Sequence, residues 1–260
     1  MRLLTSQHFP KYIGGSSCPK HKKSNIIFEH ERPRLLKNAP NGWKVSSAKK
    51  VYSNDLIELY EDTLDLNGIE KVYTRGVRKD YSTIVPFISD EEILVIKSYR
   101  HLVDSILIEI PSGYIDKGES PKEAAIRELK EETGYSAKDV ISIGHYTLDY
   151  SMFDQRGNLF VAYGLVKVGN QSLGIMEKID VESISIKKIK QLLLEGKILN
   201  AASIVALYRA LDFHSQRAAQ RANTSNRTNS HIVLLTVKKT LDFYRLLEPF
   251  NEVIFSKCVL

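Results

Sequence analysis

The most informative segment of the sequence runs from Gly113 to Tyr135 and reads Gly-Tyr-Ile-Asp-Lys-Gly-Glu-Ser-Pro-Lys-Glu-Ala-Ala-Ile-Arg-Glu-Leu-Lys-Glu-Glu-Thr-Gly-Tyr. Its second half predicts a helix with marked ends. Ser120 can cap the N-terminus, Pro121 suits the first helical position, and Glu123 completes a capping box. Gly134 predicts the stop, because glycine adopts the left-handed conformation that ends many helices.

Three glutamates of this helix are neighbours on one face, because Glu128, Glu131 and Glu132 stand at i, i+3 and i+4. Such like charges repel one another, and a divalent cation removes the repulsion. Oxygen ligands of this kind favour Mg²⁺, with Mn²⁺ as the alternative. Taken alone, a glutamate-rich helix is more often only a solvated acidic face. An apolar face suited to packing on a sheet consists of Ala125, Ile126, Leu129 and Thr133.

The whole stretch resembles the Nudix box. That pattern is Gly, five residues, Glu, seven residues, Arg-Glu, an apolar residue, any residue, Glu-Glu, any residue, Gly, and an apolar residue. At residue usages of roughly 5–7% each, a chance match of seven identities is on the order of 10⁻⁹ per starting position. All seven fixed identities match, at Gly113, Glu119, Arg127, Glu128, Glu131, Glu132 and Gly134.

Two segments before the box are similar to the ADP-ribose pyrophosphatase branch of that family. Ile108–Gly113 resembles its Glu-Leu-Pro-Ala-Gly segment, and Lys97–Arg100 resembles its Gln-Tyr-Arg. The likeness in layout covers residues 43–213. It implies an α/β fold of the Nudix type, an α/β/α sandwich around a mixed β-sheet, with an N-terminal β-hairpin region.

The resemblance implies a metal-dependent hydrolase that cleaves the pyrophosphate of a nucleoside diphosphate linked to another moiety, most simply ADP-ribose or a related nucleotide sugar. Glu128, Glu131 and Glu132 would hold the metal, and the backbone carbonyl of Ser112 would be a further ligand. Glu131 also belongs to the implied catalytic set. Glu177, in a stretch that resembles the acidic Glu-x-Ile-Glu-Val loop of the branch, is the implied general base, with Asp180 as the reserve.

The remaining site residues divide between substrate binding and support of the box. Arg100 would contact the pyrophosphate or terminal sugar, because a guanidinium binds phosphate oxygens in pairs, and Glu109 is assigned to the same substrate contact. Glu119 and Arg127 are predicted to form an ion pair that fixes the loop at residues 113–119 onto the helix. Arg127 is predicted to project about 100° away from Glu128. The structural set is completed by Gly113 and Gly134.

The sequence is also compatible with other functions. Hydrolases of ADP-ribose usually show a proline some 15 residues after the box, whereas this chain has none between Pro121 and Pro249. Tyr150 stands near that place, which is associated with dinucleoside polyphosphate hydrolases. A non-catalytic module that binds a nucleotide sugar is a further alternative, although such a module has no need of all three metal glutamates. Hydrolysis of RNA caps, assisted by basic tails, is the weakest.

Charge and composition divide the chain into three predicted parts. These are a basic N-terminal extension at residues 1–42, a hydrolase domain at 43–213, and a polar linker with a C-terminal helix at 214–260. Their formal net charges are +6, −4 and +4, so the core is not expected to bind DNA. Only two cysteines and no apolar run of roughly 18–20 residues predict a cytoplasmic protein without a transmembrane segment. A homodimer through residues 50–78 is expected by resemblance.

Local signals predict the remaining elements. Asn67-Gly68 predicts a hairpin, and Ser89–Glu92 predicts a second one between strands at residues 83–88 and 93–96. Residues 105–110 read as a buried strand, and further strands are predicted near 140–147, 158–167 and 181–186. Helices are predicted at residues 187–195, 201–213 and 231–247, with a linker at 214–230.

Overall fold

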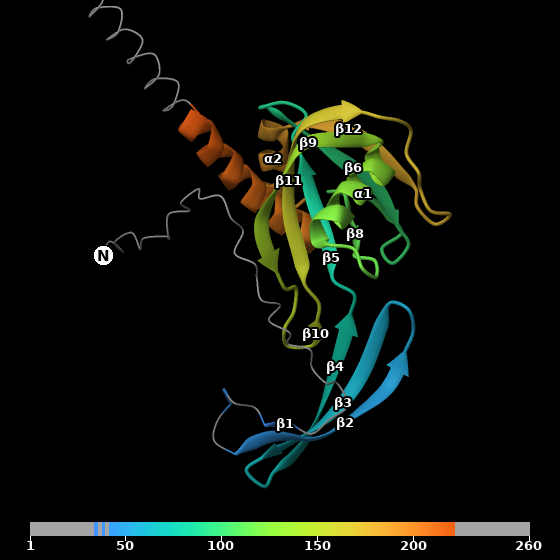
Figure 1. Cartoon of the computed structure of the whole chain (residues 1–260), viewed down its shortest axis with the longest axis vertical. Coiled ribbons are helices and arrows are strands. Elements are labelled where there is room, and N and C mark those ends of the chain that lie inside the picture. The colour runs from blue at the N-terminus through green and yellow to red at the C-terminus, as the bar shows by residue number, and fades with distance from the viewer. Residues whose placement is uncertain (1–33, 36–37, 40–41, 222–260) are drawn as a thin grey trace, which may run out of the picture. The chain divides into compact units, whose positions relative to one another are not determined.

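The computed structural model describes residues 34–35, 38–39 and 42–221 (Figure 1). The chain divides into two compact units between Gly76 and Val77, a boundary that falls inside the predicted 43–213 part. Most of the predicted N-terminal extension and the predicted helix at 231–247 lie outside the described residues. No helix of the described part is long and apolar enough to cross a membrane.

The first unit is built on a sheet with strand order β1-β2-β3-β4. At the turn between β3 and β4, Asn67 and Gly68 have φ values of 60° and 88°. Two consecutive positive φ angles are what a two-residue hairpin turn requires, so the hairpin predicted here is confirmed. The strands of this sheet are β1 (Arg34–Leu35), β2 (Trp43–Ser53), β3 (Ile57–Leu66) and β4 (Glu70–Arg78).

The second unit contains a mixed four-stranded sheet of order β8-β5-β11-β9. Strand β11 runs parallel to β5 and antiparallel to β9. This confirms the predicted mixed sheet. Its strands are β5 (Tyr81–Pro86), β8 (Ser112–Tyr114), β9 (Tyr135–Tyr146) and β11 (Gly157–Lys167), with the short β10 (Phe153–Asp154) preceding β11.

A second sheet of this unit has the order β12-β6-β7 and is antiparallel throughout. It consists of β6 (Glu92–Arg100), β7 (Ser105–Glu109) and β12 (Ile179–Ser185). Strand β7 leads directly into β8, so the two sheets meet at the start of the Gly113–Tyr135 stretch. The strand predicted at 105–110 is present, but Ile106 is 65% exposed, and the expectation of full burial is wrong.

The hairpin predicted around Ser89–Glu92 is also wrong as a sheet element. Strands β5 and β6 turn at that place but enter different sheets, and a single bridge joins Phe87 to Ile93. The physical reason is that β5 is buried along its whole length and is paired on both sides, by β8 and β11. Pairing with β8 covers Tyr81–Thr83, and the contact left to β6 is the Phe87–Ile93 bridge just beyond the end of β5.

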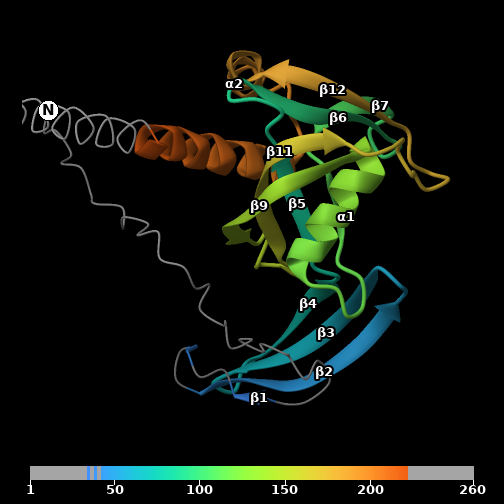
Figure 2. The same cartoon turned by 45° about the horizontal axis from the view of Figure 1, so that its top comes forward.

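Helices cover the mixed sheet on both faces, as Figure 2 shows. On one face, Ala125 and Leu129 of α1 (Pro121–Thr133) pack on Ile84, Phe160 and Ala162. The alternate residues of the same strands point the other way and join a larger core with α2 (Ile186–Leu194) and the helix at residues 201–221. This two-sided packing agrees with the predicted α/β/α sandwich.

Two details of the helices differ from the sequence predictions. Ile126 is 39% exposed, whereas Ala124, which the predicted packed face does not include, is fully buried. The helix predicted to end at residue 213 continues to 221, the last residue described, so the predicted linker is wrong for 214–221. This continuation is held by aromatic contacts, because His214 stacks on Phe87 at a ring distance of 4.3 Å and Arg217 lies over Tyr163.

Candidate active site

Local sequence signals set the start and the end of α1. The Ser120 hydroxyl accepts a hydrogen bond from the Glu123 N–H at 3.2 Å, and the Glu123 carboxylate accepts one from the Ser120 N–H at 2.8 Å. The hydroxyl of Ser82 on β5 donates to the carbonyl of Pro121 at 2.7 Å and ties the helix start to the sheet. At the other end Gly134 is left-handed, with φ 72°. The predicted capping box and glycine stop are confirmed.

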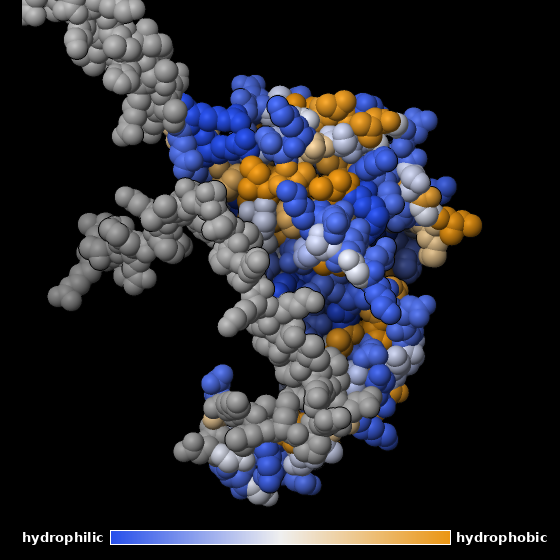
Figure 3. Space-filling view, in the orientation of Figure 1, coloured by the Kyte–Doolittle hydropathy of each residue, from blue (hydrophilic) through white to orange (hydrophobic). Residues whose placement is uncertain are grey.

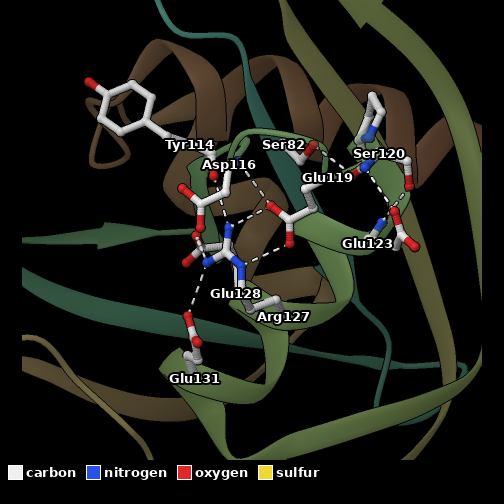
Figure 4. A network of polar contacts seen from close by, with 10 residues as sticks. Ser82, Tyr114, Asp116, Glu119, Ser120, Glu123, Arg127, Glu128 and Glu131 are labelled. Carbon is white, nitrogen blue, oxygen red and sulfur yellow. Dashed lines mark hydrogen bonds and ion pairs between the residues drawn. The ribbon is translucent and has the colours of Figure 1, made fainter. Parts of the chain in front are cut away.

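Arg127 joins the preceding loop to the helix, as the dashed lines in Figure 4 show. Its Nε donates to Glu119 Oε1 at 2.9 Å, and its Nη2 donates to Glu119 Oε2 at 3.0 Å and to the Tyr114 carbonyl at 2.9 Å. These charged hydrogen bonds hold the pKa of Glu119 below its ordinary value. The predicted ion pair between Glu119 and Arg127 is therefore present, and it closes the loop onto the helix.

Arg127 also contacts two of the helix glutamates. Its Nη1 lies 2.6 Å from Glu128 Oε1 and 3.0 Å from Glu131 Oε2. The prediction that Arg127 would stand apart from Glu128 is wrong. The 100° step fixes only where the side chains leave the helix, whereas a long arginine and a glutamate can bend toward each other beyond that point.

Glu128 and Glu132 are buried, whereas the Glu131 side chain is 41% exposed. Burial raises the pKa of Glu128, and the hydrogen bond from Arg127 opposes this rise. Burial raises the pKa of Glu132 well above its ordinary value, the charges of Glu128 and Glu177 add to the rise, and a backbone N–H of Ser112 opposes it at 3.0 Å. Among the described residues Glu132 forms no ion pair, and the charge of Arg100 only partly offsets the rise in its pKa.

The donor set of this corner suits a hard divalent cation, because it consists of carboxylate oxygens with backbone groups beside them. Within residues 34–35, 38–39 and 42–221, however, no group of three or more His, Cys, Asp or Glu side chains is already gathered as a metal site. The contacts of Arg127 explain this in part, since it engages Glu128 and Glu131. The oxygen ligands present suit a divalent cation. In this structure Arg127 forms ion pairs with two of them, Glu128 and Glu131.

A second charged group lies at the junction of β6, β7 and the helix at 201–221. Arg100 donates from Nε to both oxygens of Glu109, at 3.2 and 3.1 Å, and its Nη2 also bonds Glu109. Glu109 is 2% exposed, whereas the Arg100 side chain is 47% exposed. The Glu109 bonds, together with the charges of Glu132 and Glu177, raise the pKa of Arg100, which places these acids within electrostatic reach of the guanidinium.

Asn200 completes this group and was not among the sequence candidates. Its Nδ2 donates to Glu109 Oε1 at 3.1 Å, and its Oδ1 accepts from the Ser203 N–H at 3.1 Å. The second contact is that of a helix N-cap. An asparagine just before a predicted helix is a recognisable cap signal, but nothing local indicates that its amide reaches a residue 91 positions earlier.

Glu177 lies on the loop between β11 and β12. Its side chain is exposed, and its Oε2 accepts from the Gly174 N–H at 2.7 Å. Its charge acts on Glu128, Glu132 and Arg100, so the loop brings it within range of the box. The loop tip is strongly apolar, with Ile175 and Met176 99% and 82% exposed, and it shows hydrophobic colour at the right edge of Figure 3.

The two reserve residues of the sequence analysis lie on exposed positions. Asp180 is on β12, opposite Lys97 of β6. Tyr150 is in a turn before β10 and is 77% exposed. Neither makes a contact, within the part of the chain described, that joins it to the carboxylates of α1.

Comparison with known proteins identifies this arrangement. Residues 78–198 match the NUDIX domain. The chain is 27% identical over 166 residues to the methanol dehydrogenase activator of Bacillus methanolicus and 26% identical over 166 residues to the ADP-ribose pyrophosphatase of Bacillus subtilis. Each match covers 63% of this chain and 90% of the relative. A crystal structure of an ADP compounds hydrolase superposes with a TM-score of 0.60 at 25% identity, over 72% of this chain and 96% of that one.

Proposed function

We propose that this chain, which matches the NUDIX domain over residues 78–198 and is similar to ADP-ribose pyrophosphatases, is a pyrophosphohydrolase that cleaves the pyrophosphate of ADP-ribose or a related nucleotide sugar. The observation that carries the proposal is the pair of buried carboxylates, Glu128 and Glu132, with the half-exposed guanidinium of Arg100 within electrostatic reach of Glu132. Carboxylates and a guanidinium in electrostatic contact suit a substrate that carries both phosphate charge and a bound cation.

The proposed cofactor is Mg²⁺, with Mn²⁺ as a substitute. Glu128, Glu131 and Glu132 would hold it, with the carbonyl of Ser112 as a further ligand. The support is the oxygen-only donor set, the burial of Glu132 without a paired cation among the described residues, and the hydrogen bond that brings the Ser112 backbone to Glu132. When bound, a divalent cation neutralises charge on phosphate oxygens and lowers the pKa of water.

The side chains of the protein supply binding, orientation and proton transfer. Arg100 binds a phosphate oxygen, because Glu109 fixes one side of its guanidinium and leaves it half exposed. Glu177 takes the proton of the attacking water, since its exposed loop position and its charge coupling to Glu132 suit a group that meets a bound substrate. Water oxygen bonds to one phosphorus as the bridging P–O bond breaks, and a nucleoside monophosphate and a sugar phosphate leave.

The proposal extends to assembly and location. A homodimer would form through residues 50–78, where exposed apolar side chains include Val51, Tyr52 and Val72, at 45%, 50% and 68% exposure. The chain contains two cysteines, which suits the reducing cytoplasm. Light scattering at micromolar concentration tests the dimer, and a monomeric mass would contradict it.

The test of the proposed reaction is a substrate panel with Mg²⁺, scored by the identity of the products. The panel contains ADP-ribose, other nucleotide sugars, dinucleoside polyphosphates and NADH. We expect ADP-ribose or another nucleotide sugar to give the highest kcat/KM, with AMP and a sugar phosphate as the products of ADP-ribose. A higher kcat/KM for dinucleoside polyphosphates would show that the proposed substrate is wrong. If no compound of the panel is hydrolysed, the proposed reaction is wrong.

A further inference from the structure

The first turn of the helix at 201–221 is attached to the end of β7 at two adjacent residues. Asn200 bonds the side chain of Glu109, and the Ser203 hydroxyl accepts the N–H of Ile110 at 3.1 Å. Ser203 is 2% exposed and Glu109 is 2% exposed. The segment that leads into the box is therefore braced from a helix some 90 residues later in the chain.

The orientation of the Asn200 amide is determined by its two partners. A backbone N–H can only donate, so the Ser203 N–H requires the Asn200 oxygen, and the carboxylate of Glu109 can only accept, so it requires the Asn200 nitrogen. The amide thus links the helix cap to the carboxylate with no freedom to turn over. Glu109 in turn accepts hydrogen bonds from Arg100 at both of its carboxylate oxygens.

From this chain of contacts we propose that Asn200 is a positioning residue for Arg100, acting through Glu109. The inference rests on the proposed function, since it assigns Arg100 to substrate phosphate. Glu109 Oε1 accepts from both Asn200 Nδ2 and Arg100 Nε. Removal of the amide leaves Glu109 with a single fixed partner whose side chain is half exposed. The carboxylate and the guanidinium can then turn together, and the phosphate-binding donors lose their fixed direction.

The simpler role for Asn200 is that it only caps the helix, and a pair of variants separates the two. Asn200→Ser keeps a good N-cap residue but is too short to reach Glu109. Asn200→Asp also keeps the cap but replaces the donor by a carboxylate that faces Glu109. The matched control is Ser185→Ala, which removes the cap of α2, where the Ser185 hydroxyl accepts from the Lys188 N–H.

With a nucleotide sugar as substrate, Asn200→Ser should raise KM about tenfold with a smaller change in kcat, the scale of one charge-assisted hydrogen bond. Its Tm should stay near that of the wild type. Asn200→Asp should raise KM further, and Ser185→Ala should lower Tm without changing KM. In an Arg100→Ala background, Asn200→Ser should have no additional effect, because the two residues act in one chain. A wild-type KM in Asn200→Ser, or additive effects in the double variant, would overturn the proposal.

A readout that does not involve turnover separates this inference from the proposed function. The ¹⁵N–¹H signal of Arg100 Nε, assigned by its loss in Arg100→Lys, should exchange slowly with water in the wild type and faster in Asn200→Ser. If that change occurs in a protein that hydrolyses no substrate of the panel, the positioning by Asn200 stands and the proposed reaction falls. If hydrolysis is found but the signal is the same in both proteins, the positioning role falls.

Discussion

Gly113 lies directly against the carboxylate of Glu128, with no space between them for a side chain. A β-carbon at position 113 would lie 1.9 Å from Glu128 Oε1 and 2.2 Å from its Cδ. The glycine of the box is therefore required by close approach, since Gly113 has no positive φ. This contact joins β8 to α1 and fixes the place that the Glu128 carboxylate occupies.

Gly113→Ala should consequently act on the site more than on the fold. The contacted atoms are the flexible end of a side chain, so Glu128 can move aside with a loss of about 1–2 kcal/mol in the free energy of unfolding. Activity should fall by about 10²-fold, because a displaced ligand forfeits charge stabilisation. Kinetics measure the loss of activity, and thermal melts measure the loss of stability. Gly169→Ala is the control, because a β-carbon there meets nothing within 4 Å, and equal activity in both variants would disprove the contact.

Arg127→Ala should lower both Tm and activity. The side chain is 27% exposed and holds Glu119, Glu128 and Glu131. Breaking a fully buried pair costs roughly 3–5 kcal/mol and an exposed one under about 1, so this partly buried cluster should lose about 2 kcal/mol. That corresponds to a Tm lower by about 4–8 °C. Lys97→Ala, which removes an exposed pair with Glu182, should change Tm far less. An unchanged Tm in Arg127→Ala together with a loss of activity would indicate that Arg127 acts in the reaction and not in support of the loop.

Glu132→Gln should lower activity by about 10²-fold or more while the metal-free protein keeps or gains stability. The amide oxygen can still accept from the Ser112 N–H, and the variant removes a charge whose burial is unfavourable. Thermal melts without metal test the expected stability, and kinetics at saturating Mg²⁺ test the expected loss of activity. The exposed Glu182→Gln serves as control. Wild-type turnover in Glu132→Gln would exclude Glu132 as a ligand.

Added Mg²⁺ should raise the Tm of the wild type. A ligand at about a hundred times its Kd stabilises the folded state by about 2.7 kcal/mol, which corresponds to about 5–10 °C here. The rise should be absent in Glu132→Gln and should reverse on addition of a chelator. Scanning calorimetry in buffers of equal ionic strength measures it. A rise of the same size with Na⁺ at matched ionic strength would indicate charge screening instead of a site.

Glu177→Gln should reduce kcat by about 10²-fold or more, the range expected for loss of a general base. Because Glu177 is exposed on its loop, the substitution should leave Tm within about 1 °C of the wild type. Asp180→Asn on the adjacent strand is the matched comparison, and its kcat should stay near that of the wild type. If Asp180→Asn lowers kcat and Glu177→Gln does not, the general base is Asp180 and not Glu177.

Features that depend on residues close together along the chain could be predicted from the sequence. The limits of α1 follow from Ser120, Glu123 and Gly134, since caps act within three residues of the helix end. The turn at Asn67-Gly68 follows from backbone conformations that few other residue pairs accept. The spacing of the box indicated the likeness to the NUDIX domain, which residues 78–198 match, because it constrains residue types at fixed distances along one loop and one helix.

Contacts between residues far apart along the chain could not be predicted from the sequence and depend on tertiary packing. No local signal separates β5 from β6, because their separation depends on the pairing of β5 with β8 and β11. The reach of Arg127 to Glu128 depends on side-chain bending that helical periodicity does not describe. Asn200 meets Glu109 because packing of the helix at 201–221 against the core sets the position of its cap. Such contacts are set by the burial of apolar surface over the whole unit, which no window of sequence contains.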